Sequence, residues 1–424
     1  MRANPAVALL ALVAAPLSAQ QKTVTLPDAI RLALKAQPAY ITAVGNAGTA
    51  HTKEREYLGA WLPSVTLPTS VSQSSSTRID ATTQKPVPSA ASTSYSAGLN
   101  LSMTVFDGLR RESQGRLNGA SSDAADATVV TQRFGVILST KQAFYTALAA
   151  NEAVDAAQLA VQRSTEQLKV TRDKLKNGSA IRSDTLQAFV DLGTAQLNLL
   201  SAQTQREQQE ANLARLIGVD GEVRPVGDTA PPPPVALDTA SVRREAMDKS
   251  PSIAQAVAQA HVADANVGVA RSQYFPSITA SYSNSYGGTD LAALANTWNA
   301  RVGLNWTLFN GFTRETGMAQ ASAARDAALA TADDQRRGVG AQLTQYFAAL
   351  VSAQSQTAIG ETSRAAAAEG LRIVQERYRL GAATIVDVLA AQTALGQAES
   401  QLVTAHLNYQ IAKAQIEALI GREL

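Results

Sequence analysis

The side chains that most often carry catalysis or bind metals are scarce in this sequence. It has 424 residues, no cysteine and only three histidines, His51, His261 and His406, which stand far apart. Without cysteine there is no disulfide, thiolate metal ligand, cysteine nucleophile or lipid-modified N-terminal cysteine. Isolated histidines are most often structural, and no glycine loop with a lysine is present to hold a phosphate. We therefore expect no enzyme, no metal site and no cofactor.

The charge balance excludes another class of partner. The sequence has 37 Lys and Arg residues against 35 Asp and Glu, which leaves a net charge of +2. A nucleic-acid-binding protein usually shows a broad basic surface. We therefore expect no nucleic-acid partner.

One pair of carboxylates stands at equivalent places in the two halves of the chain. Asp184 and Asp387 each follow a glycine, Gly178 or Gly381, by six residues. Thr384 stands three residues before Asp387, which is the spacing of a capping pair at a helix N-terminus. In the first half Ile181 stands in place of the threonine, so the carboxylate remains without the cap. Capping and a functional role for the two aspartates both stay open at this point.

The first residues indicate the compartment. Arg2 precedes an apolar run, residues 6–15, and small Ala19 stands just before Gln20. This order is typical of a secretory signal peptide, which we place at residues 1–19. The apolar run is about half the ~20 residues that a membrane-spanning helix needs. We therefore expect an exported mature chain without a transmembrane helix.

The mature chain is a tandem duplication. Residues 61–66 match residues 274–279 at an offset of 213, while residues 106–108 match 309–311 at an offset of 203. The glycines and aspartates above share the second offset. We expect a first structural repeat at residues 20–221, a Pro-rich linker or equatorial segment at 222–240, and a second repeat at 241–424, each repeat with helices and two strands.

Long helices occupy most of each repeat. No proline occurs between Pro88 and Pro225 or after Pro276, and both stretches are rich in good helix formers. Residues 108–176 predict a helix of about 100 Å, and residues 39–62 and 184–217 predict two shorter helices that stack end to end beside it. Large residues recur every seven positions from Val388 to Ile416, with alanines three positions later. This heptad pattern predicts lateral packing with left-handed supercoiling.

Four segments between the helices alternate with a period of two. The clearest cover residues 94–105, 278–286 and 298–308, and a weaker one covers 65–71. Apolar residues on one face and Ser, Thr and Asn on the other are typical of a transmembrane β-barrel strand, although a soluble half-buried hairpin has the same period. We favour the membrane and expect the lipid-facing side chains to include Leu99, Leu101, Met103, Val302, Leu304 and Trp306.

Four strands cannot close a barrel, because closed membrane barrels begin at about eight strands. The protein must therefore oligomerise, and a dimer, trimer or tetramer would supply 8, 12 or 16 strands. Periodicity alone does not choose among them.

The ordered motifs resemble one family. Residues 26–30 (Leu-Pro-Asp-Ala-Ile), Gly381 followed by residues 384–389, and the terminal residues 419–421 (Leu-Ile-Gly), together with the duplication, resemble the TolC-like outer-membrane efflux proteins. The resemblance implies a mainly α fold with β, in which a tandem-duplicated long-helix α-barrel protomer contributes four strands to a trimeric 12-stranded transmembrane β-barrel. It also implies a homotrimer in the outer membrane of a Gram-negative-type bacterium, in contact with outer-membrane lipid and extending into the periplasm.

The same resemblance assigns roles to the tips of the long helices. Asp387 matches a position that lines the constricted entrance of such ducts, and Tyr378 and Asp184 match residues that tie the closed tip together. Gly178 and Gly381 form the tip turns. Two positions depart from some members of the family, with Ala390 in place of a second entrance aspartate and Ala383 in place of an arginine.

Two functions follow from these observations. The first is a passive exit duct of a tripartite efflux or type I secretion system, which works with a periplasmic adaptor protein and an inner-membrane pump. The alternative is a soluble periplasmic coiled-coil adaptor, which explains the heptads but leaves the four alternating strands unexplained.

Overall fold

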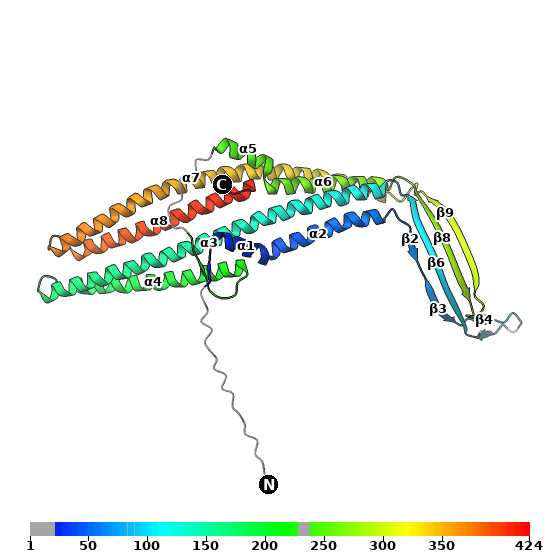
Figure 1. Ribbon diagram of the computed structural model, residues 1–424, viewed down its shortest axis with the longest axis horizontal. Helices are drawn as coiled ribbons and strands as arrows, with labels where there is room; N and C mark the ends of the chain where they lie inside the picture. Colours follow the sequence, from blue (N-terminus) through cyan, green and yellow to red (C-terminus); the bar gives the residue numbers. More distant parts are fainter. Residues whose placement is uncertain (1–21, 83, 89, 228–237) are drawn as a thin grey trace, which may run out of the picture. The chain divides into compact units, whose positions relative to one another are not determined.

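A computed structural model describes residues 22–82, 84–88, 90–227 and 238–424 (Figure 1). The predicted signal peptide, residues 1–19, and the proline run 231–234 lie outside the described residues. In the part of the chain that the structure describes, no helix combines the length and the apolar character that crossing a membrane requires.

The chain forms two compact units that both draw on the two halves of the sequence. One unit contains Met1–Ile41, Gln132–Asp248 and Gly340–Leu424, and the other contains Thr42–Thr131 and Lys249–Val339. This arrangement follows from the length of the helices, since the two 67-residue helices α3 (Arg110–Lys176) and α7 (Thr313–Arg379) each contribute to both units. The division of the sequence at residues 221 and 241 stays a prediction.

The second unit carries an antiparallel sheet. Its strands occur in the order β2/β3, β6, β8, β9, with β2 and β3 both paired to β6 (Figure 1). Their bounds are Ser64–Thr66 (β2), Thr69–Ser74 (β3), Ser92–Phe106 (β6), Ser277–Gly288 (β8) and Ala295–Asn305 (β9). The weak fourth pattern is split because Pro68 has no N–H to give to the ladder; its carbonyl accepts from Gly98 N at 2.9 Å. A small hairpin of β4 (Thr77–Ile79) and β5 (Pro86–Pro88) was not expected from the sequence.

Helices lead into and out of this sheet. Helix α2 (Pro38–Gly59) precedes β2, and α6 (Pro251–Ser272) precedes β8. Helix α3 begins four positions after the end of β6, and α7 begins eight positions after the end of β9. Each half of the chain therefore runs from a helix through its strands into a long helix, which is the order that the proline spacing and the change of period predict.

The first unit holds the other helices and a small parallel strand pair. Helices α4 (Arg182–Ile217) and α8 (Ile385–Ile420) follow tight turns after α3 and α7, and the short helices α1 (Leu26–Ala36) and α5 (Thr239–Lys249) were not resolved as separate helices by the sequence patterns. Strand β1 (Lys22–Val24) pairs with β7 (Val223–Pro225). Its main core packs α1, α3 and α4 around Phe144, Leu213 and Ile217, each at most 1% exposed.

Most of the heptad positions of α8 are buried. Val388, Leu395, Tyr409 and Ile416 are all at most 5% exposed, as are Ala405 and Ala412. Burying one such large side chain stabilises a fold by about 1.5–3 kcal/mol. The alternation of large residues and alanine lets helix backbones approach closely while the large residues fill the seam.

Candidate functional site

The sheet exposes a continuous apolar face. Leu99, Leu101 and Met103 on β6 share this face with Val302 and Leu304 on β9, because the paired registers place Tyr282 opposite Leu101 and Ala280 opposite both Met103 and Val302. Val302 is 76% exposed and Leu304 67%. Large exposed apolar patches mark sites of interaction with lipid or protein. The structure therefore puts five of the six predicted lipid-facing residues on one unpartnered side of the sheet.

The opposite face of the sheet is covered with hydroxyl groups. Ser64 and Ser102 lie with their Oγ atoms 2.6 Å apart, and Ser70 and Ser96 at 2.8 Å. Between β8 and β9 on the same face, Ser285 Oγ and Thr297 Oγ1 lie 2.9 Å apart. A sheet with one apolar and one polar side is the arrangement of a membrane strand that separates lipid from a water-filled interior.

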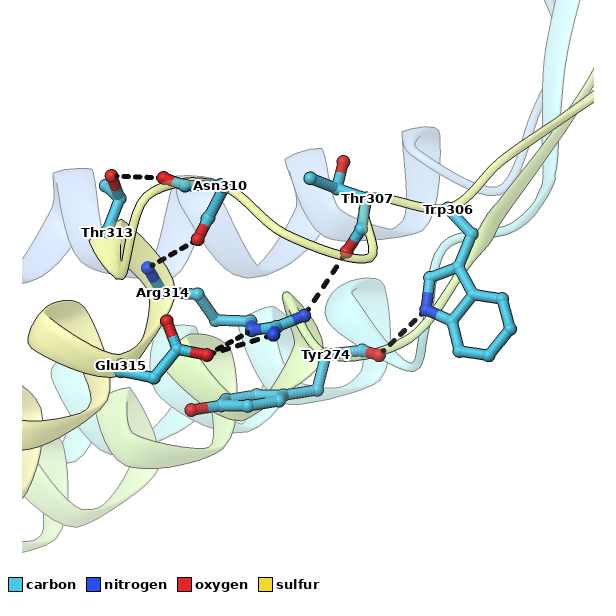
Figure 2. A network of polar contacts seen from close by, with 7 residues as sticks. All are labelled: Tyr274, Trp306, Thr307, Asn310, Thr313, Arg314 and Glu315. Atoms are coloured by element: carbon cyan, nitrogen blue, oxygen red, sulfur yellow. Dashed lines mark hydrogen bonds and ion pairs between the residues drawn. The ribbon is translucent and has the colours of Figure 1, made fainter.

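Trp306, the sixth predicted lipid-facing residue, lies just beyond the end of β9 in a network that joins strand to helix (Figure 2). Its indole Nε1 donates to Tyr274 O at 3.3 Å. Arg314 lies over the ring of Tyr274, with 4.3 Å between its Cζ and the ring centroid, and its Nη1 donates to Thr307 O at 3.3 Å. Arg314 also forms a salt bridge with Glu315 at 2.9 Å. One arginine thus holds both the segment that enters β8 and the segment that leaves β9.

A matching network occurs in the first half of the chain. Arg111 lies 4.2 Å from the ring centroid of Trp61, and its guanidinium donates to Ala60 O and Val105 O at 3.3 and 3.2 Å. Asp107 replaces the neutral Asn310 of the second half, and its Oδ2 accepts from Nε and backbone N of Arg111, both at 3.1 Å. The side chains of Arg111 and Asp107 are only 10% and 16% exposed.

The turns before the two arginines share an uncommon backbone conformation. Gly108 and Leu109 have φ values of 71° and 65°, and Gly311 and Phe312 have 67° and 66°. A non-glycine residue in this region is strained and persists only where its surroundings enforce it. The arginine networks supply that enforcement at both strand-to-helix junctions.

The other candidate site is the pair of turns that join the long helices to α4 and α8. Gly178 and Gly381 have φ values of 72° and 79°, the left-handed conformation that ends a helix without a Cβ clash. Ser179 N donates to Lys174 O, and Ala382 N donates to Arg377 O, so both turns close in the same way. Leu380, beside Gly381, is 83% exposed.

Asp387 caps helix α8 and is exposed. Its Oδ2 accepts from Thr384 N and Oγ1, both at 2.8 Å, and Asp387 N donates to Thr384 Oγ1 at 3.3 Å. The hydrogen bond from the Thr384 backbone, followed by that from its hydroxyl and by the charge of Arg377, lowers the pKa of Asp387 from its ordinary value. The carboxylate therefore remains charged at neutral pH at this turn.

Tyr378 joins the two helical hairpins through residues that the sequence did not single out. It is 4% exposed and packs in an apolar cluster with Leu168, Ile385 and Val388. Lys174 Nζ donates to Tyr378 O and lies 4.1 Å from the centre of its ring, while the Tyr378 hydroxyl lies 3.5 Å from Thr171 Oγ1.

In the described part of the chain, Asp184 forms no hydrogen bond with Tyr378, whose hydroxyl lies beside Thr171. Its side chain is half-buried in the first turn of α4, and within the described residues its carboxylate makes no hydrogen bond or ion pair. The tie between Asp184 and Tyr378 that the family resemblance implies stays a prediction.

One serine, histidine and aspartate do come together in the second unit. His51 Nδ1 lies 2.7 Å from Ser122 Oγ, and its Nε2 lies 3.2 Å from Asp126 Oδ1. The Ser122 side chain faces the interior, with the residue only 2% exposed, so a substrate has no access to its hydroxyl. The three residues link α2 to α3 and form no nucleophilic site.

The arginines and the lysine were missed for different reasons. Arg111 and Arg314 share the offset of 203 that relates Gly108 to Gly311, so extending the repeat alignment by three residues would have found them. Lys174 has no such signal, because Arg377 stands at the equivalent position and bonds instead to Ala382 O within its own turn.

Comparisons with known proteins agree with this arrangement. The model of the outer membrane efflux protein family matches residues 59–219 and 242–422. The pyoverdine export outer membrane protein OpmQ of Pseudomonas putida is 25% identical over 346 residues, which are 78% of this chain and 71% of OpmQ. The outer membrane protein TolC of Escherichia coli is 23% identical over 349 residues, or 78% of this chain and 70% of TolC.

Solved outer-membrane channels share the fold. The Campylobacter jejuni CmeC channel superimposes with a TM-score of 0.81 at 19% identity, over 93% of this chain and 85% of CmeC. The outer membrane protein VceC of Vibrio cholerae gives 0.79 at 19% identity, over 94% and 96% of the two chains. These likenesses confirm the predicted fold class of long helices with barrel strands.

The duplicated helices, the two-faced sheet and the family match together confirm the outer-membrane duct over the soluble adaptor. The four alternating segments, which the adaptor interpretation does not explain, form strands of one sheet whose apolar face is exposed. The family match covers most of both halves of the chain. The chain therefore belongs to the outer membrane efflux protein family, whose members are channels of the outer membrane and not enzymes.

Proposed function

We propose that three copies of this chain form one passive duct, through which cargo delivered by a periplasmic adaptor and an inner-membrane pump leaves the cell. The observation that carries this proposal is the main sheet of the second unit, which has an exposed apolar face, a hydroxyl-lined face and two free edges. A sheet of this kind has no stable place in water as a single copy.

The free edges explain why copies would associate. Strands β2 and β3 form one edge and β9 the other, and along the sheet each is paired on its inner side alone. Unpaired backbone groups in a membrane cost several kcal/mol each, so spanning sheets close into barrels. Joining β9 of one copy to β2 and β3 of the next closes the ring, and three copies give the 12 strands that the family resemblance implies.

The entrance of this duct would be the set of turns at Gly178 and Gly381. Threefold symmetry makes Asp387 a ring of three carboxylates. Its capping bonds use Oδ2, so Oδ1 can face a passing cation while the cap is intact. We propose that this ring makes the entrance cation-selective and that Tyr378 and Asp184 restrain its opening.

The adaptor would bind at the same end of the hairpins. Apolar side chains are exposed at both turns, including Ile181 at 66%, Val386 at 58% and Leu380 at 83%. Exposed apolar residues next to charged ones suit a protein partner. The relatives include both a pyoverdine export protein and an alkaline protease secretion protein, AprF of Pseudomonas aeruginosa, so the pump partner decides between drug or metabolite efflux and protein secretion.

Disulfide trapping across the free edges tests the trimer. The chain has no cysteine, so a pair with one cysteine in β3, at Ser70 or Ser72, and one in β9, at Thr297 or Asn299, is introduced without background. Strands β3 and β9 are separated by β6 and β8, about 14 Å at ~4.8 Å per strand, too far for a disulfide within one chain. Oxidation in intact cells should therefore link different copies.

The expected result is a ladder that ends at a covalent trimer on non-reducing gels for at least one pair. Asn299→Cys alone is the matched control and should remain monomeric in denaturant. A ladder ending at dimer or continuing to tetramer would contradict the 12-stranded barrel. Absence of any ladder, with the protein in the soluble periplasmic fraction, would refute the duct itself.

A further inference from the structure

One charged side chain stands on the hydroxyl-lined face of the sheet. The strands of the second unit contain no aspartate or glutamate in the residues that the structure describes, and their only charged residues are Arg78 on β4 and Arg301 on β9. Arg78 belongs to the separate β4–β5 hairpin. Arg301 is therefore the single charge within the main sheet.

The strand register fixes the face on which Arg301 lies. Its Cα is opposite Ser281, which is opposite Ser102, which is opposite Ser64. Ser64 and Ser102 form a hydroxyl pair on the polar face. Thr297 forms another with Ser285, and Thr297 precedes Arg301 by four positions in β9, so that both lie on the same face. The neighbours in sequence, Ala300 and Val302, lie on the apolar face. Arg301 thus points to the polar side, in a row that is otherwise serine.

Within the described residues, no acidic group pairs with this arginine. Arg301 is exposed, and among the residues that the structure describes it makes no salt bridge. This distinguishes it from Arg111 and Arg314, whose guanidinium groups are held by Asp107 and Glu315. A guanidinium group has five N–H donors in a planar fork that fits carboxylate, phosphate and sulfate oxygens.

From this placement we propose that Arg301 is an anion-binding residue of the barrel interior, and that three copies form a ring that binds acidic groups of cargo during exit. This inference rests on the proposed trimer. Twelve strands about 4.8 Å apart and tilted by about 40° give a Cα radius of roughly 12 Å. An extended arginine spans about half of that radius, which brings three guanidinium groups to about 10 Å from one another, close to the Debye length of about 8 Å in physiological salt.

The consequence is a preference among cargo molecules. A molecule that carries two or more acidic groups can contact more than one arginine of the ring, while serine hydroxyls of the same row donate further hydrogen bonds. A cationic molecule is repelled at this level. Beyond the cation-selective entrance, this level of the barrel therefore favours molecules that carry carboxylate, phosphate or sulfate groups.

Current block by tripolyphosphate in planar bilayers tests the ring. Tripolyphosphate is added to each compartment in turn, and the concentration that halves the current of the purified trimer is measured. We expect block of the wild type, a half-blocking concentration at least ~10-fold higher for Arg301→Ala, and a value within about 3-fold of wild type for Arg301→Lys. Asn299→Ala, neutral and on the same face, and Arg78→Ala, in the separate β4–β5 hairpin, should both leave the block unchanged.

Calorimetric titration of the detergent-solubilised trimer with tripolyphosphate gives a second measurement that does not depend on an open tip. It should show binding to the wild type and loss of binding in Arg301→Ala. Equal block and equal binding in wild type and Arg301→Ala would overturn the inference while leaving the duct intact, as would loss of block in Arg78→Ala alone. A wild type that forms neither trimers nor channels would overturn the proposed function together with the ring.

Discussion

Replacing Arg111 by alanine tests whether the strand-to-helix junctions hold the sheet strands on the helices that adjoin them. Of the two junction arginines, Arg111 should be the more costly to remove, because its partner Asp107 is a carboxylate with a side chain only 16% exposed. Removing the arginine leaves that charge in a poorly solvated place. Breaking a buried pair from one side costs about 3–5 kcal/mol.

The contacts of Arg111 give a similar magnitude. A hydrogen bond to a charged partner contributes about 1.5–3 kcal/mol and the contact with the Trp61 ring about 1 kcal/mol. Asp107 keeps its bond from the backbone N–H of residue 111, which lowers the loss. We expect Arg111→Ala to reduce the free energy of unfolding by about 3–4 kcal/mol.

The second junction supplies the internal comparison. Arg314 pairs with Glu315, whose side chain is 42% exposed, and Asn310 carries no charge. Arg314→Ala therefore leaves no buried charge, and we expect a loss of about 1–2 kcal/mol, since one cation–ring contact and hydrogen bonds to neutral groups are lost. Adding Asp107→Asn to Arg111→Ala should recover about 1–2 kcal/mol by removing the unpaired carboxylate.

Guanidinium-induced unfolding of the detergent-solubilised protein, followed by tryptophan fluorescence, measures these differences. Trp61 stacks on Arg111 and reports on the first junction directly. Equal losses for Arg111→Ala and Arg314→Ala, or no recovery in the double variant, would refute the reasoning that a buried carboxylate makes the first junction the tighter one.

Three further predictions concern the barrel and the tip. Leu304→Arg should reduce insertion and the yield of heat-resistant trimer, at about 2–4 kcal/mol near the bilayer midplane, whereas Asn100→Arg on the polar face should insert normally; equal yields would contradict the assigned faces. Lys174→Met removes the tie to Tyr378 O and its ring and should raise single-channel conductance; a wild-type conductance would mean that this contact does not restrain the tip. Because Thr384 donates to Asp387 and lowers its pKa, the stabilising cap and the cation selectivity are both present above the ordinary value near 3.9 and are lost only as pH falls below it. Reversal potentials in a salt gradient should therefore change below about pH 4 in the wild type and already at pH 7 in Asp387→Asn, and a wild type that loses selectivity above pH 4 would contradict the capped carboxylate.

Periodicity predicted the regular elements well. The heptad from Val388 to Ile416 coincides with the buried side of α8, and the period-two segments coincide with β6, β8 and β9. These patterns survive because each element has one apolar side along its whole length. The split at Pro68 was missed because two short strands with one bend between them still alternate.

Contacts between distant segments could not be predicted from the sequence. Lys174 and Tyr378 are more than 200 positions apart and meet because two helical hairpins pack side by side, a fact that no local pattern contains. The same holds for Arg163 and Glu399, which form a bidentate pair between α3 and α8. The junction arginines are an intermediate case, since the repeat offset locates them but only the structure shows what they hold.

Cysteine accessibility along the strands tests the central claim most directly, that the two faces of this sheet meet lipid on one side and water on the other. Because the chain has no cysteine, single cysteines at Asn100, Ser283 and Asn299 can be compared in intact cells with single cysteines at Leu101, Val302 and Leu304. The account predicts that a membrane-impermeant maleimide labels the first three and leaves the second three protected. Equal labelling at all six positions, or labelling of the apolar set alone, would contradict it.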